Sequence, residues 1–258
     1  MIAPTAIRAI VSRDMARALR QKSRLLGGLA RPFMWLLLVG AGYNAIARVD
    51  GATSYQAFVF PGVVVMATLF GGMLTAIATV YDREFGMLRL MLASPAGVTA
   101  VLAGRALAAT AVGAIQGGAV LIFAPLLMPI SAAQLAPAAG ALILSAWTSA
   151  LLGLLVAAPL RSVENFAGIV NIVLFPLLFL SVGLYPVETL PGVLRAAAVL
   201  NPVTYAVDLM RHALGQPAEL GVGRSLMALA MTAIVTFAVT ALVFDPESRL
   251  TSPRPGLR

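Results

Sequence analysis

The sequence predicts an all-α integral membrane protein with six transmembrane helices, and three observations support this fold class. Of the 258 residues, 60% are hydrophobic and 11% are charged, whereas a soluble domain carries about 25% charged residues. The mean hydropathy, +0.94, is high. Apolar runs recur along the chain, and a helix that crosses a bilayer needs about 20 such residues. We therefore expect a single domain, residues 1–258, with spans at 32–47, 57–80, 98–128, 135–160, 163–184 and 220–244.

The chain before the first span, residues 5–26, predicts an amphipathic helix that lies at the membrane interface. Ile7, Ile10 and Met15 belong to an apolar stripe with helical spacing. The remaining surface carries six basic residues, Arg8, Arg13, Arg17, Arg20, Lys22 and Arg24. A basic amphipathic helix settles on an anionic lipid leaflet. It serves either as a topology anchor or as a gate or elbow helix leading into the first span.

The basic residues also predict the orientation of the spans, because cytoplasmic loops of membrane proteins are enriched in Lys and Arg. With a cytoplasmic N-terminus, 14 of the 18 basic residues fall on the cytoplasmic side, and Arg48, Arg195, Arg211 and Arg224 fall outside. Both termini are then cytoplasmic. This distribution accounts for the formal charge of +8 without a nucleic-acid partner.

Residues 81–95, between the second and third spans, predict a short cytoplasmic helix with an apolar edge. Asp82 and Glu84 are expected in its first turn, where carboxylates interact favourably with the helix dipole. Phe85 and Leu88 follow at helical spacing. A Ser-Pro pair ends the helix, because the residue before a proline disfavours the α conformation. We expect the apolar edge of this helix to bury against a partner.

Residues 185–219, between the fifth and sixth spans, are rich in apolar residues yet interrupted by four prolines. Two short helices fit between the prolines, Pro191–Leu200 and Val203–Leu214. Irregular backbone at membrane depth is tolerated only where protein or a cavity covers it. The pattern predicts a re-entrant helical hairpin that dips into the outer leaflet and caps the bundle. An ordinary outer loop is the alternative.

Motifs for catalysis are missing, so we expect no catalytic residue and no metal site. The only lysine, Lys22, is not preceded by the glycines of a phosphate-binding GxxxxGK[ST] loop. His212 is the only histidine, which excludes an HExxH zinc site, and the chain has no cysteine. Ion-driven transporters usually carry buried ionisable residues in their spans. Acidic residues are missing from the first four expected spans, and Glu164 lies at the edge of the fifth, so a proton-coupled pump is also disfavoured.

Small and polar residues within the spans indicate close helix packing. Gly113 and Gly117 form a GxxxG pair, which lets two helices approach closely. Gln116 can hydrogen-bond across helices, and Asn171 is a polar residue of the fifth span. The alternative for all four residues is a place along a substrate pathway.

Two sequence motifs lie in segments that join the six expected spans, one between the second and third spans and one between the fifth and sixth. The first is Asp82-Arg83-Glu84-Phe85-Gly86-Met87-Leu88, followed by Ala93-Ser94-Pro95. The second, before the last span, is Asn201-Pro202-Val203-Thr204-Tyr205-Ala206-Val207-Asp208, followed by Arg211. Together with the layout, they resemble ABC-2-type permeases, the membrane subunits of ATP-binding-cassette exporters. The resemblance covers nearly the whole chain and is nearest to the subgroup of drug-resistance and nodulation lipo-oligosaccharide exporters. Polysaccharide exporters are similar too.

The resemblance implies a division of labour between subunits. A separate ATPase subunit would bind ATP and Mg, and two permease chains, a homodimer, would form the pathway in the bacterial inner membrane. The 81–95 helix would be a coupling helix that docks in a groove on the ATPase. Its motif would supply polar contacts from Asp82, Arg83 and Glu84, an apolar plug from Phe85, and also Gly86 and Leu88. The outer hairpin would carry Asn201, Pro202, Tyr205, Asp208 and Arg211.

The function implied by the resemblance is ATP-driven export of a hydrophobic or amphipathic substrate. A drug, a lipid-linked saccharide and a polysaccharide all fit this description. Two other classes stay open: a channel or membrane scaffold that works without an ATPase, and a membrane-embedded enzyme, for which the sequence shows no catalytic constellation.

Overall fold

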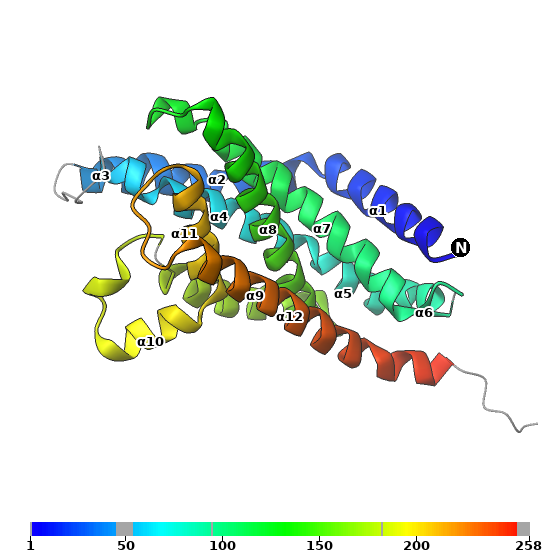
Figure 1. Cartoon of the computed structure of the whole chain (residues 1–258). Coiled ribbons are helices and arrows are strands. Elements are labelled where there is room, and N and C mark those ends of the chain that lie inside the picture. Colours follow the sequence, from blue (N-terminus) through cyan, green and yellow to red (C-terminus); the bar gives the residue numbers. More distant parts are fainter. Residues whose placement is uncertain (1, 45–53, 94, 182, 252–258) are drawn as a thin grey trace, which may run out of the picture.

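The computed structural model describes residues 2–44, 54–93, 95–181 and 183–251, and within these ranges all regular structure is helical. Figure 1 shows an elongated bundle in which the long helices run along a common direction. The helices are α1 Ile2–Arg20, α2 Lys22–Met34, α3 Gly40–Asn44, α4 Tyr55–Thr75, α5 Ile77–Glu84, α6 Met87–Leu92, α7 Gly97–Leu121, α8 Ala132–Ala157, α9 Val163–Phe179, α10 Gly192–Leu200, α11 Pro202–Ala213 and α12 Val222–Thr251. A π-helical turn, Trp35–Val39, joins α2 to α3, and 3-10 turns occupy Ala124–Leu126 and Val187–Thr189.

Five helical stretches in the described residues are long and apolar enough to cross a membrane, namely Leu25–Tyr43, Tyr55–Glu84, Gly97–Leu126, Ala132–Ala157 and Val222–Phe244. A bent pair, α10 with α11, raises the number to six if it is counted as one span. The helix α9 is apolar but has 17 residues, so it is shorter than these five. The predicted fold class, an all-α membrane protein, is confirmed.

Helix α4 lies at the centre of the bundle, and 16 of its 21 residues are buried. It packs against α7 and α8 at close range, and glycine makes this possible. A Cβ atom on Gly113 would lie 3.0 Å from the carbonyl oxygen of Thr68, and one on Gly117 only 2.5 Å from the Thr68 Cγ2. The contacts of Gly113 and Gly117 are therefore those of helix packing, the first of the two alternatives drawn from the sequence.

The first span begins earlier than the expected range 32–47. The chain leaves the helical conformation at Gln21, whose backbone angles are φ −87° and ψ 63°, and α2 starts directly after it. Arg31 consequently lies inside the span Leu25–Tyr43, with its guanidinium 4.9 Å from the ring centre of Phe70. Residues 45–47 of the expected span lie outside the described residues.

The expected fifth span, 163–184, is also shorter in the structure, because α9 ends at Phe179. Beyond it the chain turns in toward α4, where Gly62 and Gly183 meet backbone to backbone. A Cβ atom on Gly62 would lie 2.6 Å from the Cα of Gly183. A continuing helix would carry the chain past this contact.

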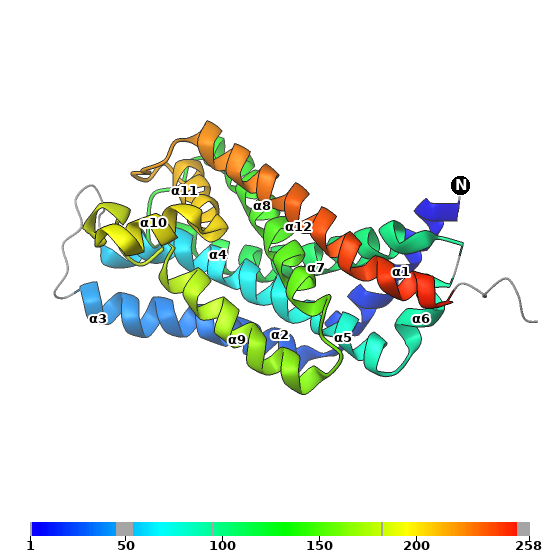
Figure 2. The same cartoon turned by 90° about the horizontal axis from the view of Figure 1, so that it is seen from below.

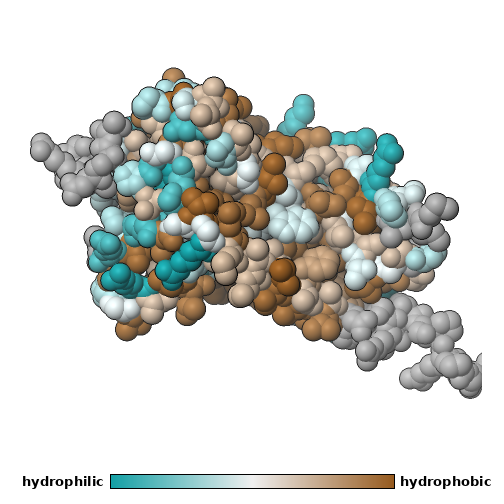
Figure 3. Space-filling view, viewed as in Figure 1, coloured by the Kyte–Doolittle hydropathy of each residue, from teal (hydrophilic) through white to brown (hydrophobic). Residues whose placement is uncertain are grey.

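The two sequence motifs lie at opposite ends of the bundle (Figures 1 and 2). One end holds the N-terminus, α6 and the last turns of α12, and the other end holds α3, α10 and α11. Figure 3 shows that hydrophilic side chains on the visible face gather toward these ends, with a largely apolar region between them. This distribution is the one expected of a protein that spans a bilayer.

Candidate functional site

The 81–95 segment is built from two helices rather than one. Helix α5 continues the second span to Glu84, and Gly86 then adopts φ +76°, a left-handed conformation that favours glycine and often follows a helix end. Helix α6 starts at Met87. The expectation that Asp82 and Glu84 occupy the first turn of a short helix is therefore wrong, since both lie in the last turn of α5.

Asp82 is 4% exposed and lies in a group of charged residues that we call the ion cluster, formed by Arg13, Asp14, Arg17, Asp82 and Arg105. Its carboxylate accepts hydrogen bonds from Arg105 of α7 at 2.5 Å, and from Arg13 and Arg17 of α1 at 2.7 and 3.3 Å. The second carboxylate, Asp14, lies 3.7 Å from Arg105. Asp82 thus connects α5 to α1 and α7 inside the protein.

Arg105, like Asp14, is a residue of the ion cluster that the sequence interpretation missed. Its side chain is 2% exposed, and it donates to Thr79 as well as to Asp82. Burying a guanidinium without a partner is costly, so an arginine within the third span requires a carboxylate nearby. That rule, applied to Arg105, would have pointed to Asp82 or Asp14 as an internal partner.

Arg83 points from α5 to the turn between α8 and α9. Its Nη1 atom donates to three backbone carbonyl oxygens at the end of α8, those of Ala157, Ala158 and Leu160. Its guanidinium also lies 5.2 Å from the ring centre of Phe244 in α12. The C-terminus of a helix carries unsatisfied carbonyl groups and partial negative charge, so a cation here is favourable.

Glu84 contacts the other side of the same turn. Its Oε2 atom accepts a hydrogen bond of 3.2 Å from the backbone N–H of Val163, the first residue of α9. The N-terminus of a helix carries unsatisfied N–H groups and partial positive charge, so a carboxylate here is favourable. Asp82, Arg83 and Glu84 thus all contact other helices of the same chain.

Four large apolar side chains of the 81–95 segment are exposed, beside the exposed charged residues Glu84 and Arg89. Tyr81, Phe85, Met87 and Leu90 are 42, 77, 44 and 69% exposed, and we call these four residues the docking patch. The rings of Tyr81 and Phe85 stack with centroids 6.3 Å apart. Leu88, which the sequence grouped with the coupling residues, is fully buried and anchors α6 to the core.

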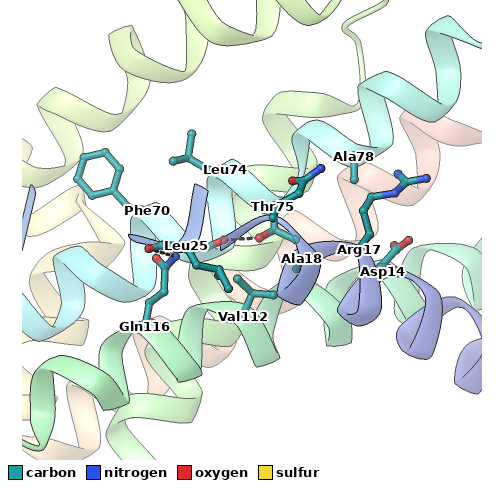
Figure 4. Close-up of a pocket in the computed structure, with 12 residues that line it drawn as sticks. Asp14, Arg17, Ala18, Leu25, Phe70, Leu74, Thr75, Ala78, Val112 and Gln116 are labelled. Atoms are coloured by element: carbon teal, nitrogen blue, oxygen red, sulfur yellow. Dashed lines mark hydrogen bonds between the residues drawn. The ribbon is translucent and has the colours of Figure 1, made fainter. Parts of the chain in front are cut away.

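A small cavity of about 30 Å³ lies between α1, α2, α4 and α7 (Figure 4). It has room for about two water molecules. Arg17 and Asp14 lie toward one end of it, and Gln116 and Phe70 toward the other. Gln116 is 4% exposed; its amide N–H donates to the Leu25 carbonyl at 3.5 Å, and its Oε1 has no hydrogen-bond partner in the described residues.

Gln116 and Asn171 therefore differ in position. Gln116 fills the seam between α2, α4 and α7, where a Cβ atom on Gly28 or Gly71 would lie 2.7 or 2.9 Å from its amide. Asn171 is exposed on α9 and donates to the carbonyl of Ala167, one turn earlier in the same helix. Only Gln116 contacts another helix through its side chain amide.

At the far end, α10 and α11 meet at 78°, close to the two short helices predicted from the prolines. Asn201 forms the bend: its Oδ1 accepts from the N–H of Val203, and its Nδ2 donates to the Leu177 carbonyl at 2.7 Å. Pro202 occupies the first helical position of α11, and Tyr205 donates to the carbonyl of Val199. The motif residues therefore fix the shape of the hairpin.

The second half of that motif ties α11 to the chain that follows. Asp208 is fully buried and accepts hydrogen bonds from the N–H groups of Glu219 and Leu220 and from the Ser225 hydroxyl. Arg211 is 1% exposed, lies 4.2 Å from the ring centre of Phe58, and approaches Glu219 at 3.7 Å. Burial raises the pKa of Glu219.

In the described residues, no group of three His, Cys, Asp or Glu is placed to hold a metal ion.

Comparison with known proteins identifies one family and several relatives. The sequence model of the ABC-2 type transporter matches residues 5–214. Nodulation protein J of Rhizobium leguminosarum bv. trifolii is 30% identical over 196 residues, which cover 75% of each chain. Nodulation protein J of Rhizobium meliloti (strain 1021) is 29% identical over 224 residues, covering 85% of each chain. A protein of Pyropia yezoensis named as transport permease ycf38 is 27% identical over 212 residues, covering 80% of this chain and 72% of the relative.

Proposed function

Since the chain belongs to the ABC-2 type transporter family, we propose that it is the membrane subunit of an ATP-driven exporter whose ATP is hydrolysed by a separate ATP-binding-cassette subunit. Family membership makes it a transport permease. The absence of a GxxxxGK[ST] loop from the sequence supports a partner that binds ATP and Mg in its place.

The observation that carries this proposal is the docking patch. Its four large apolar side chains are exposed at the end of the bundle that holds the N-terminus and α6. Leu88 and Leu92 anchor this turn to the core. Burying one such side chain in a partner contributes about 1.5–3 kcal/mol. An exposed apolar patch of this kind marks an interaction site. We propose that the ATPase covers it, with Phe85 as the central contact.

The revised contacts restrict which residues dock. Asp82, Arg83 and Glu84 already contact other helices, so we propose that docking rests on Tyr81, Phe85 and their neighbours in α6. The motif then has two parts: charged side chains whose contacts are to other helices of the protein, although Glu84 is exposed, and apolar side chains that contact the partner.

Orientation and location complete the proposal. Of the 14 basic residues assigned to one side, Arg31 and Arg105 lie well inside spans, and the other 12, against four outside, support cytoplasmic N- and C-termini, which place the docking patch in the cytoplasm. We propose the bacterial inner membrane as the location and a second copy of the chain as the other half of the pathway. No nucleic acid is involved.

The proposed substrate class is the one that the family resemblance implies, and the names of the relatives support transport. Two of them are named for nodulation, and a third is named as a transport permease. We propose a hydrophobic or amphipathic substrate, which includes drugs, lipid-linked saccharides and polysaccharides.

Co-purification of an ATP-binding-cassette ATPase with the tagged chain tests the proposal. The wild-type chain, tagged and reconstituted in lipid, is expected to retain the ATPase, and Phe85→Ala is expected to weaken retention about tenfold or more, the equivalent of about 1.4 kcal/mol. Leu200→Ala is the matched control, because Leu200 is 84% exposed but belongs to α10, which lies at the opposite end of the bundle. Equal retention by all three proteins would show that the docking patch does not bind the ATPase.

A further inference from the structure

Resting on the proposed function, we infer that Arg83 and Glu84 are positioning residues, which carry the movement of the docked 81–95 segment into the turn between α8 and α9. Arg83 holds the carbonyl end of α8, and Glu84 holds the amide end of α9, and we call this pair the clamp. Neither residue then needs to contact the ATPase.

The clamp is suited to this role because its partners are backbone atoms. A side-chain partner can change rotamer and release the contact, whereas the carbonyl groups of Ala157 and Ala158 and the N–H of Val163 move only with their helices. Each charge also has the sign that the helix end prefers. A displacement of the end of α5 is therefore expected to displace the α8–α9 turn with it.

Helix α9 is suited to respond because few of its side chains are buried. Its outward side chains are exposed, with Ile172 at 72% and Phe175 at 52%. Only Phe166, Val170 and Leu174 of α9 are buried. A helix held by few buried side chains moves at a lower free-energy cost than a core helix such as α4. The clamp thus connects the docking patch to a helix that few buried side chains hold in place.

Distance measurements on paired spin labels test the clamp without disturbing it. The chain has no cysteine, so labels can be placed without background. One pair, Arg89→Cys with Asn165→Cys, joins exposed positions on α6 and α9. A second pair, Arg89→Cys with Val193→Cys, joins α6 to the hairpin at the far end. Between the nucleotide-free and ATP-bound complexes, the second distance is expected to change and the first to stay constant. A first distance that changes as much as the second would overturn the inference.

Charge-removing variants give the functional test. Arg83→Gln and Glu84→Gln are expected to retain the ATPase and its basal hydrolysis at wild-type levels, but to lose transport by about 5- to 150-fold, the usual range of a coupling between sites. Arg83→Lys is expected to recover part of the loss, because an ammonium group keeps the charge at the end of α8. Arg224→Gln, an exposed arginine in the first turn of α12 and far from the docking patch, is the control and is expected to transport normally.

The outcomes separate this inference from the proposed function. Loss of ATPase retention in Arg83→Gln and Glu84→Gln would make them docking residues and overturn the clamp, as would normal transport by both. A wild-type chain that retains no ATPase would overturn the proposed function itself, and the clamp with it.

Discussion

Removing the carboxylate of Asp82 is expected to destabilise the protein strongly, because it leaves a buried arginine without its main partner. Asp82 is 4% exposed and Arg105 is 3% exposed, and the two are joined at 2.5 Å. Breaking a buried ion pair by removing one partner costs about 3–5 kcal/mol. Asp14, 3.7 Å from Arg105, is too distant to replace the lost hydrogen bond. We expect Asp82→Asn to lower the free energy of unfolding by about 3–5 kcal/mol.

The assay is denaturant titration of the purified chain in one fixed detergent, followed by helix content. Glu164→Gln is the control, because Glu164 is an exposed carboxylate in α9. We expect this control to stay within about 1 kcal/mol of wild type, since a charge in the first turn of a helix contributes about 0.3–1 kcal/mol. The double variant Asp82→Asn with Arg105→Met is expected to be more stable than Asp82→Asn alone, because it removes the unpaired charge.

Two results would refute the reasoning about the ion cluster. One is an Asp82→Asn variant whose free energy of unfolding lies within about 0.5 kcal/mol of wild type, as for an ordinary surface substitution. The other is a double variant whose two losses add, since independent sites are additive and residues in one charge network are not.

Three further predictions concern the packing, the hairpin and the topology. Gly117→Ala is expected to lower the free energy of unfolding by about 1–3 kcal/mol through overpacking, because its Cβ would lie 2.5 Å from a side chain of α4. Thermal unfolding measures the loss, and Gly140→Ala, at a position with open space, is the control. Asn201→Ala is expected to lower stability by about 0.5–2 kcal/mol through the lost helix cap while ATPase retention stays normal; loss of retention would mean that the two ends of the bundle are not separable. A cysteine replacing Ser12 is expected to be protected from an impermeant reagent applied outside the cell, and a cysteine replacing Val193 is expected to react with it. The reverse result would overturn the orientation.

The elements of this fold could be predicted from the sequence because hydrophobicity alone marks them. Apolar runs give the spans, and the prolines give the two hairpin helices to within about one residue at each end. The break at Gln21 gives no comparable signal, because a single non-helical residue is set by how α1 and α2 pack on their neighbours. The short length of α9 likewise depends on the contact between Gly62 and Gly183, which joins residues 121 positions apart in the sequence.

The site could be located from the sequence, but its internal contacts could not. Helical spacing placed Phe85 and Leu88 on one face, as it does for a continuous helix. The left-handed Gly86 separates them, so Phe85 is exposed and Leu88 is buried. A glycine after an apolar run is a known helix-ending signal. The acidic residues Asp82 and Glu84 beside Gly86 instead favoured a helix that begins at this place. The sequence does not show that these residues contact other helices of the chain.

The charged triplet gains its meaning from helix geometry. Successive side chains of an α-helix point about 100° apart, so three consecutive residues at the end of α5 reach three different sides. Asp82 contacts α1 and α7, Arg83 contacts α8 and α12, and Glu84 contacts α9. The next residue, Phe85, is 77% exposed. A partner that moves Phe85 therefore acts on five helices through one turn, because no residue intervenes between the docking side chain and the three charges.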